Sequence, residues 1–178
     1  MKHKMLHLLF VFAIVFSANS QNNLNLKKFS YNGLHCEILD SVKKTVKANV
    51  PFEYNPQKLT IPSTVFFKNE AYTITELGRI GPYVETLEIP ATIIKIDDCH
   101  MPICEVTGDG TEPALHTILV SKDNPNYSSS NGVLFNKDKT LLIYYPTGKE
   151  DDIYQIPNSV KKNREICVYL DVFIGKNS

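Results

Sequence analysis

The chain has 178 residues, and its 19 basic residues balance 19 acidic ones, which gives a formal net charge of zero at pH 7. This balance leaves no electrostatic footprint for nucleic acid or for an anionic bilayer, so neither is expected as a partner. A hydrophobic fraction of 43% in a chain near the size of one domain suffices to bury a core without disulfides or metal ions as its main support.

The first twenty residues have the pattern of a secretory signal peptide. Lys2 and Lys4 give a positively charged start, an apolar run follows over residues 6–16, and small residues precede a cleavage point before Gln21. The apolar run is too short to cross the roughly 30 Å hydrocarbon layer as a helix. We therefore predict an exported chain, secreted or on the cell surface, with a signal peptide at residues 1–20 and no membrane span.

A polar leader and an N-terminal β-hairpin cap are predicted for residues 21–58. Apolar residues recur over 29–39 on both sides of Asn32-Gly33, a dipeptide that favours the positive φ angles of a tight two-residue turn. Residues 45–50 extend the cap as a further strand, because Pro51 interrupts regular pairing only after them.

A seven-residue motif then occurs three times, at 59–65, 87–93 and 154–160. Each copy reads as an aliphatic or aromatic residue, a spacer, Ile-Pro, a small residue, Thr or Ser, and Val or Ile. A unit that recurs in this way cannot bury its apolar face alone and must stack on its neighbours. The motif therefore predicts a solenoid.

A fourth copy, in which Ser121 replaces the proline, appears when the frame is widened. The aligned positions Ile61, Ile89, Val120 and Ile156 are 28, 31 and 36 residues apart. These spacings lie at or above the upper end of the ~20 to 29 residues of leucine-rich repeats, so insertions must bulge from the stack. We predict a leucine-rich-repeat solenoid over residues 59–160 that is short, irregular and β-rich, with little helix.

Two hairpins are predicted within the repeat region. The first joins residues 64–67 to 72–78, and the second, inserted hairpin joins 133–135 to 140–145 around a charged turn. We expect the inserted hairpin to project from the solenoid edge or to pack along it. The tail, residues 161–178, fits the repeat worst. Apolar residues alternate over 166–174, which favours a terminal strand, but no polar cap follows it. We therefore predict an atypical C-terminal tail, with truncation as one explanation.

In their order, these motifs resemble the BspA-like leucine-rich repeat proteins, whose repeat runs Leu-x-x-Ile-x-Ile-Pro-x-Ser-Val-x-x-Ile-Gly-x-x-Ala-Phe-x-x-Cys. The resemblance covers about residues 29–162 and includes Asn124-Pro125-x-Tyr127, then Asn131-Gly132-Val133-Leu134-Phe135. It implies an extracellular or surface protein that binds other macromolecules and has no conserved catalytic centre. The chain departs from the pattern at Asp97, where the repeat has Gly, and after Val160, where Ile-Gly-x-x-Ala-Phe is missing.

The spacer residues of the copies are the candidate partner-binding residues. Side chains alternate along a strand, so residues beside the inward isoleucines face outward. The predicted function is a non-enzymatic protein-binding or adhesion module whose partner is a protein or another extracellular macromolecule, without cofactor or metal. The candidate contact residues are Thr60, Thr86, Glu88, Thr117, Leu119 and Gln155.

The densest cluster of reactive side chains is the segment 97–104, which contains Cys99, His100 and Cys104. Thiolates and imidazole are zinc ligands, and a thiol with a histidine can act as nucleophile and base. Neither spacing is a strong motif, so we favour a Cys99–Cys104 disulfide or two free thiols. The alternative functions are a small secreted thiol hydrolase that uses Cys99 and His100, and a truncated repeat fragment without independent function.

Three further features have ordinary structural interpretations. His35 and His116 stand alone in apolar strands, so we expect packed or edge residues rather than ligands. The nine tyrosines are expected to fill the core and the strand edges. Asn126-Tyr127-Ser128 fits a glycosylation acceptor, which matters only in a secretory system that glycosylates.

Overall fold

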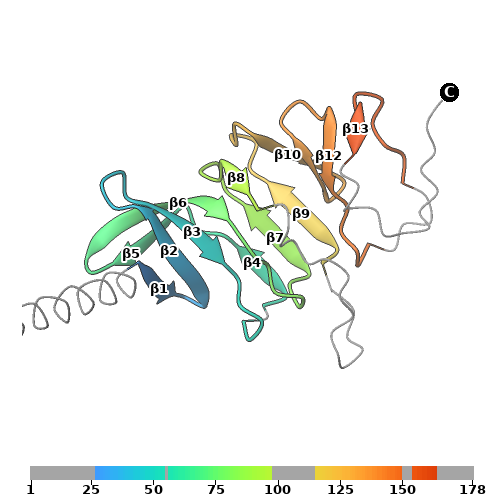
Figure 1. Cartoon of the computed structure of the whole chain (residues 1–178). Helices are drawn as coiled ribbons and strands as arrows, with labels where there is room; N and C mark the ends of the chain where they lie inside the picture. The colour runs from blue at the N-terminus through green and yellow to red at the C-terminus, as the bar shows by residue number, and fades with distance from the viewer. Residues whose placement is uncertain (1–26, 55, 98–114, 150–153, 164–178) are drawn as a thin grey trace, which may run out of the picture.

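The computed structural model describes residues 27–54, 56–97, 115–149 and 154–163. The predicted signal peptide, the Cys99–Cys104 segment and the predicted strand over 166–174 lie outside these residues. Within them the chain forms thirteen strands and no helix, so no helix there is long and apolar enough to cross a membrane. In Figure 1 the sheet that contains β1 lies at one end of the described molecule and β13 at the other, and β5 and β6 lie back beside β1 and β2. Their bounds are β1 Lys28–Tyr31, β2 Leu34–Asp40, β3 Thr45–Asn49, β4 Lys58–Thr60, β5 Thr64–Phe67, β6 Glu70–Leu77, β7 Thr86–Ile89, β8 Lys95–Ile96, β9 Thr117–Val120, β10 Tyr127–Ser130, β11 Val133–Asn136, β12 Leu141–Tyr144 and β13 Lys162–Asn163.

The N-terminal hairpin forms at the predicted dipeptide. β1 and β2 pair antiparallel, with Tyr31 opposite Leu34, and the turn residues Asn32 and Gly33 have φ angles of 45° and 84°. Positive φ at both positions is the geometry of a type I′ turn, whose twist matches that of the flanking strands. β3 then pairs antiparallel with β2, which confirms the predicted extension of the cap.

The hairpin predicted to join residues 64–67 to 72–78 is confirmed as β5–β6, and it belongs to the same sheet as the cap. The strand order is β1-β2-β3-β6-β5, with β8 also beside β6, and β3 and β6 run parallel. Phe29 of β1 stacks on Phe67 of β5 with ring centroids 4.6 Å apart, so the two edges of the sheet curl toward each other. This curled sheet of six strands is named sheet A.

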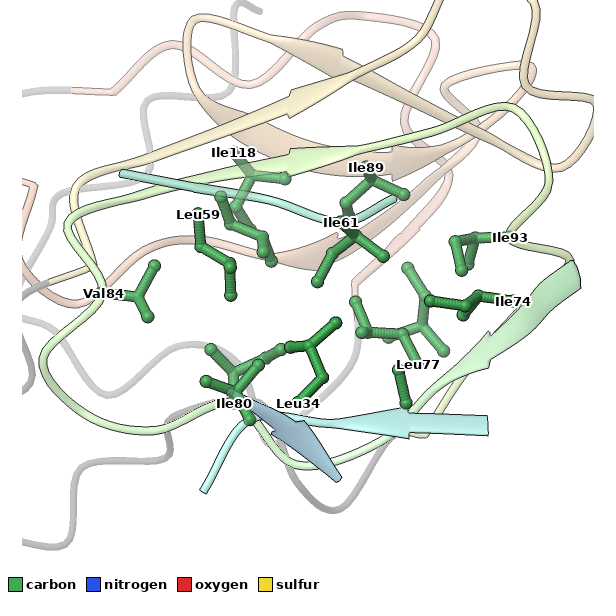
Figure 2. Close-up of a cluster of buried hydrophobic side chains, with 14 of the residues drawn as sticks. Leu34, Leu59, Ile61, Ile74, Leu77, Ile80, Val84, Ile89, Ile93 and Ile118 are labelled. Carbon is green, nitrogen blue, oxygen red and sulfur yellow. The ribbon is translucent and has the colours of Figure 1, made fainter. Parts of the chain in front are cut away.

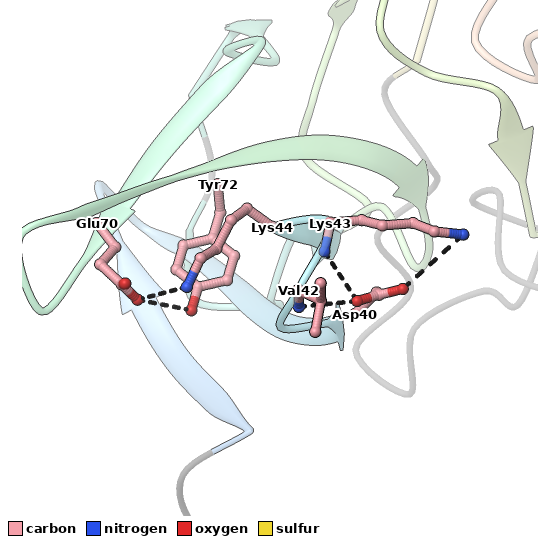
Figure 3. Close-up of polar contacts among 6 residues, drawn as sticks. All are labelled: Asp40, Val42, Lys43, Lys44, Glu70 and Tyr72. Carbon is pink, nitrogen blue, oxygen red and sulfur yellow. Dashed lines mark hydrogen bonds and ion pairs between the residues drawn. The ribbon is translucent and has the colours of Figure 1, made fainter.

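A polar cluster fixes the β2–β3 turn against β6 (Figure 3). Asp40 Oδ1 accepts hydrogen bonds from the backbone N–H groups of Lys43 (2.9 Å) and Val42 (2.8 Å), and these bonds, that of Lys43 first, hold the pKa of this carboxyl below its usual range. Lys44 Nζ lies 2.8 Å from Glu70 Oε2 and 5.2 Å from the centre of the Tyr72 ring. These contacts tie the turn to the start of β6.

The predicted repeat stack is sheet B, in which β4, β7 and β9 are all parallel. Its register places Leu59, Leu87 and Ile118 in one lateral row and pairs Ile89 with Val120 in a second. Ile61 follows β4 directly, and its backbone N–H donates to Glu88 O at 3.0 Å beside this second row. Five of these six side chains are buried, and Val120 is half-buried. The parallel pairing of successive motif copies confirms the short leucine-rich-repeat solenoid.

The main core lies between sheets A and B (Figure 2). Leu59, Ile61, Ile89 and Ile118 point from sheet B toward Leu34, Ile74 and Leu77 of sheet A, and all belong to one buried cluster. Burying an aliphatic side chain of this size contributes roughly 1.5 to 3 kcal/mol. Since the two sheets meet through their inner faces, their outer faces point in different directions.

The inserted hairpin, β11–β12, is also confirmed and packs along the solenoid end, in a third sheet of order β10-β11-β12-β13. The strand β10 was not predicted. It pairs antiparallel with β11 through Asn131 and Gly132, whose φ angles are 51° and 79°. The signal was present, because this is the same Asn-Gly dipeptide that marks the first hairpin.

The last motif copy does not extend sheet B, which corrects the expectation that Ile156 continues the stack. Residues 154–157 form no strand, and the strand that follows them, β13, pairs with β12 instead. The physical reason is that the β10–β11 hairpin occupies the position beside β9 where the next repeat strand would pair. Gly132 O accepts from Ile118 N (2.9 Å), and Ser129 Oγ accepts from Val120 N (3.0 Å).

Asn124 joins two successive repeat loops from a fully buried position. Its Nδ2 donates to the carbonyl oxygens of Pro90 and Ile93, both at 2.9 Å. Its Oδ1 accepts from the backbone N–H groups of Asn126 (2.9 Å) and Tyr127 (2.8 Å). All four hydrogen-bonding positions of the amide side chain are thereby used, as a buried polar group requires.

Candidate functional site

Sheet B presents two ordered rows of side chains on its outer face. The register aligns Lys58, Thr86 and Thr117 in the first row and Thr60, Glu88 and Leu119 in the second. Neighbouring strands in a sheet lie about 4.8 Å apart, so each row is a compact line across three strands. We call these six residues the strand face.

Five of the six predicted contact residues therefore lie together. Gln155 is exposed but lies outside β4, β7 and β9, so the structure does not bring it to the strand face. Thr60 is exposed, Leu119 is 43% exposed, and Thr86, Glu88 and Thr117 are half-buried. The face thus combines polar side chains with one accessible apolar group.

A polar network organises the centre of this face. Lys58 Nζ lies 2.8 Å from Glu88 Oε1, and Thr60 Oγ1 donates to Glu88 Oε2 at 2.5 Å. The hydrogen bond from Lys58, followed by that from Thr60, holds the pKa of Glu88 below its usual range. Glu88 is therefore an anion at neutral pH, with both oxygens oriented by neighbouring strands.

Lys58 belongs to this face but was not among the predicted contact residues. It lies two residues before Thr60, in the same register as Thr86 and Thr117. The first copy of the seven-residue motif begins at Leu59, so Lys58 lies one residue outside it. Extending the alternation by one step would have found it.

The reactive segment with Cys99, His100 and Cys104 lies outside the described residues, so the predicted disulfide and the hydrolase alternative stay predictions. Asp97, at the start of that segment, is described and forms an ion pair with Lys47 at 2.9 Å. Among the described residues, no group of three or more His, Cys, Asp or Glu side chains could hold a metal ion.

The structure also locates the two lone histidines, the tyrosines and the glycosylation candidate Asn126. His35 in β2 and His116 before β9 are both exposed. Several of the tyrosines fill the core as expected, and the buried ones are Tyr72, Tyr144, Tyr145 and Tyr154. Asn126 is exposed, and its Nδ2, the atom that a glycan would modify, donates to Ile94 O at 2.8 Å.

Cys36 is a free thiol in the main core, where burial raises its pKa to about 11. We predict that it is inert in the folded protein, because only the thiolate is a good nucleophile. In a variant with Cys99, Cys104 and Cys167 replaced by serine, a thiol reagent at pH 7.5 should label Cys36 slowly without denaturant and rapidly in urea. Equal rates would contradict its burial. The buried neutral thiol also stabilises the fold fully below pH 9.0, and this contribution is lost as pH rises toward about 11.

The sequence matches no protein-family model and no curated protein. Three solved structures of leucine-rich repeat proteins are similar to it. The protein from Bacteroides capillosus is 14% identical, with a TM-score of 0.45, over 84% of this chain and 99% of that one. The protein from Eubacterium ventriosum is 19% identical, with a TM-score of 0.37, over 75% of this chain and 54% of that one.

A leucine-rich cell surface protein from Faecalibacterium prausnitzii is 14% identical, with a TM-score of 0.31, over 75% of this chain and 65% of that one. The chain thus spans about half to two thirds of the length of the Eubacterium and Faecalibacterium proteins. At these identities and TM-scores, the fold assignment depends on the parallel register of β4, β7 and β9.

Proposed function

We propose that the chain is an exported, non-enzymatic repeat protein that binds another protein through the strand face. The observation that carries this proposal is the lateral alignment of six outward side chains on three parallel strands. Parallel stacking repeats a similar position on each strand, so it creates a surface that is ordered before any partner arrives. The basic start and apolar run of residues 1–20 support export.

The chemistry of the strand face defines the partner in outline. Leu119 offers an apolar contact, while Glu88, held by Lys58 and Thr60, offers an oriented carboxylate beside it. A partner surface with a small apolar pocket and a nearby hydrogen-bond donor would match both groups. Glu88 already has two intramolecular partners, so binding need not fix a mobile charged side chain.

The size of the face limits how much of an interface it can supply. Three strands spaced about 4.8 Å apart span only about 10 Å between the outer strands. A stable interface buries about 800 Å² on each partner, which is more than six side chains provide. The partner must therefore extend beyond the strand face, or the complex is transient.

The proposal predicts that a triple variant, Thr60→Ala with Glu88→Ala and Leu119→Ala, loses at least about tenfold in affinity for the partner. The partner would first be isolated by pull-down with residues 21–178, and the affinity then measured by biolayer interferometry with the purified pair. The physical reason is the loss of the apolar contact and of the oriented carboxylate together.

The matched control is a double variant on sheet A, Glu76→Ala with Lys95→Ala, which removes an exposed ion pair of 3.1 Å away from the strand face. It should bind with unchanged affinity. If the triple variant binds as tightly as the native chain, or if the sheet A variant alone loses affinity, the strand face is not the contact surface.

A further inference from the structure

A groove with both polar and apolar surface lies over the outer face of sheet A, away from the strand face. Its volume is about 690 Å³, within the range of small-molecule sites, and it is open to solvent. β1, β2 and β3 form its floor, and residues 50–53 together with Arg79 and Asp97 complete its lining. We call it the outer groove.

The charges of the outer groove compensate one another. The register places Lys28, Glu37 and Lys47 in one row across β1, β2 and β3. Lys47 also pairs with Asp97 at 2.9 Å. Glu53 and Arg79 complete a lining with three cationic and three anionic side chains, apart from His35. A ligand with a large net charge would meet like charges as often as opposite ones.

One of the two phenylalanines that line the groove is exposed. Phe52 is 47% exposed, and the Arg79 guanidinium lies 5.6 Å from its ring centroid. The backbone N–H of Arg79 donates to Asn49 Oδ1 at 3.1 Å, and Arg79 O accepts from Val50 N at 2.7 Å, so Arg79 is held beside the segment that carries Phe52. Phe52 therefore offers a positioned apolar surface beside a polar floor.

We propose that the outer groove binds a neutral oligosaccharide. Sugar hydroxyl groups both donate and accept hydrogen bonds, which suits a floor that mixes Lys, Glu, Ser, His and Asn side chains. The apolar C–H face of a sugar ring can pack on Phe52. An uncharged ligand also leaves the Lys47–Asp97 pair intact and avoids the desolvation of a further charge.

The test titrates residues 21–178 with neutral oligosaccharides of four to six units, built from glucose, mannose, xylose or N-acetylglucosamine. Sulfated and carboxylated oligosaccharides of the same length are titrated in parallel. Binding is followed by calorimetry and by amide chemical shifts. We expect at least one neutral series to bind, with shifts at Ser30, His35 and Asn49, and Phe52→Ala to weaken it about tenfold or more.

Two further variants separate binding from folding. Ser30 is exposed on the floor strand β1, so Ser30→Arg should obstruct the groove and weaken binding without disturbing the core. Leu119→Ala, on the strand face, should leave the affinity unchanged. The proposal is overturned if no neutral series binds at millimolar concentration, if only the charged series bind, or if both Phe52→Ala and Ser30→Arg keep full affinity. The outer groove and the strand face share no residue. Failure of the oligosaccharide proposal therefore leaves the proposed protein-binding function intact.

Discussion

Replacing Ile118 by alanine is expected to lower the free energy of unfolding by about 3 to 4 kcal/mol. Ile118 is fully buried beside Leu87, in the inward row of sheet B that also contains Leu59, and lies in the main core. Truncation loses the transfer free energy of the side chain and leaves a cavity that packed neighbours fill only in part. Urea denaturation followed by circular dichroism measures the change.

The next residue in the same strand supplies the control. Leu119 is 43% exposed on the strand face, so Leu119→Ala should change the free energy of unfolding by less than about 0.5 kcal/mol. The two substitutions remove similar numbers of atoms from adjacent positions. Comparable losses for both would show that β9 does not hold the register on which the strand face depends.

Replacing Asn124 by alanine is expected to cost about 3 kcal/mol or more, although no large apolar group is removed. The substitution leaves the carbonyl groups of Pro90 and Ile93 and the N–H groups of Asn126 and Tyr127 without the partner they have now. Each buried polar group left unpaired costs roughly 1 to 3 kcal/mol, less where water enters. The same urea titration measures this effect.

Asn126→Ala is the matched control two residues away. Asn126 is exposed and its side chain makes a 2.8 Å hydrogen bond to Ile94 O, so its loss should cost no more than about 1 kcal/mol. If Asn124→Ala is as mild as Asn126→Ala, the buried amide does not hold the two repeat loops together.

The sequence predicts the features that depend on local signals. Asn32-Gly33 identifies the first hairpin because few other dipeptides adopt positive φ twice. The Ile-Pro copies predict the register of sheet B, since aligned apolar positions must share one inner face. From that register, alternation alone placed Thr60, Glu88 and Leu119 on the same outer face.

Other features could not be predicted from local patterns because they are non-local. β3 pairs in parallel with β6 across some 28 residues, as from Thr45 to Thr73, and no local pattern specifies that partner. The copy around Ile156 has the right residues, but the β9 edge is already occupied, so it cannot join sheet B. The outer groove likewise combines distant parts of the chain, from Lys28 to Asp97. No single segment of the sequence predicts that a strand edge is occupied or that distant residues form a groove.

The hairpin that covers β9 also bears on how such a molecule could lengthen. Gly132 and Ser129 take the hydrogen bonds of Ile118 and Val120 that another strand would need. A repeat duplicated after β12 would therefore meet a closed edge, whereas one duplicated between β4 and β9 would keep parallel neighbours on both sides. The same contacts oppose the addition of a second molecule's strand to β9.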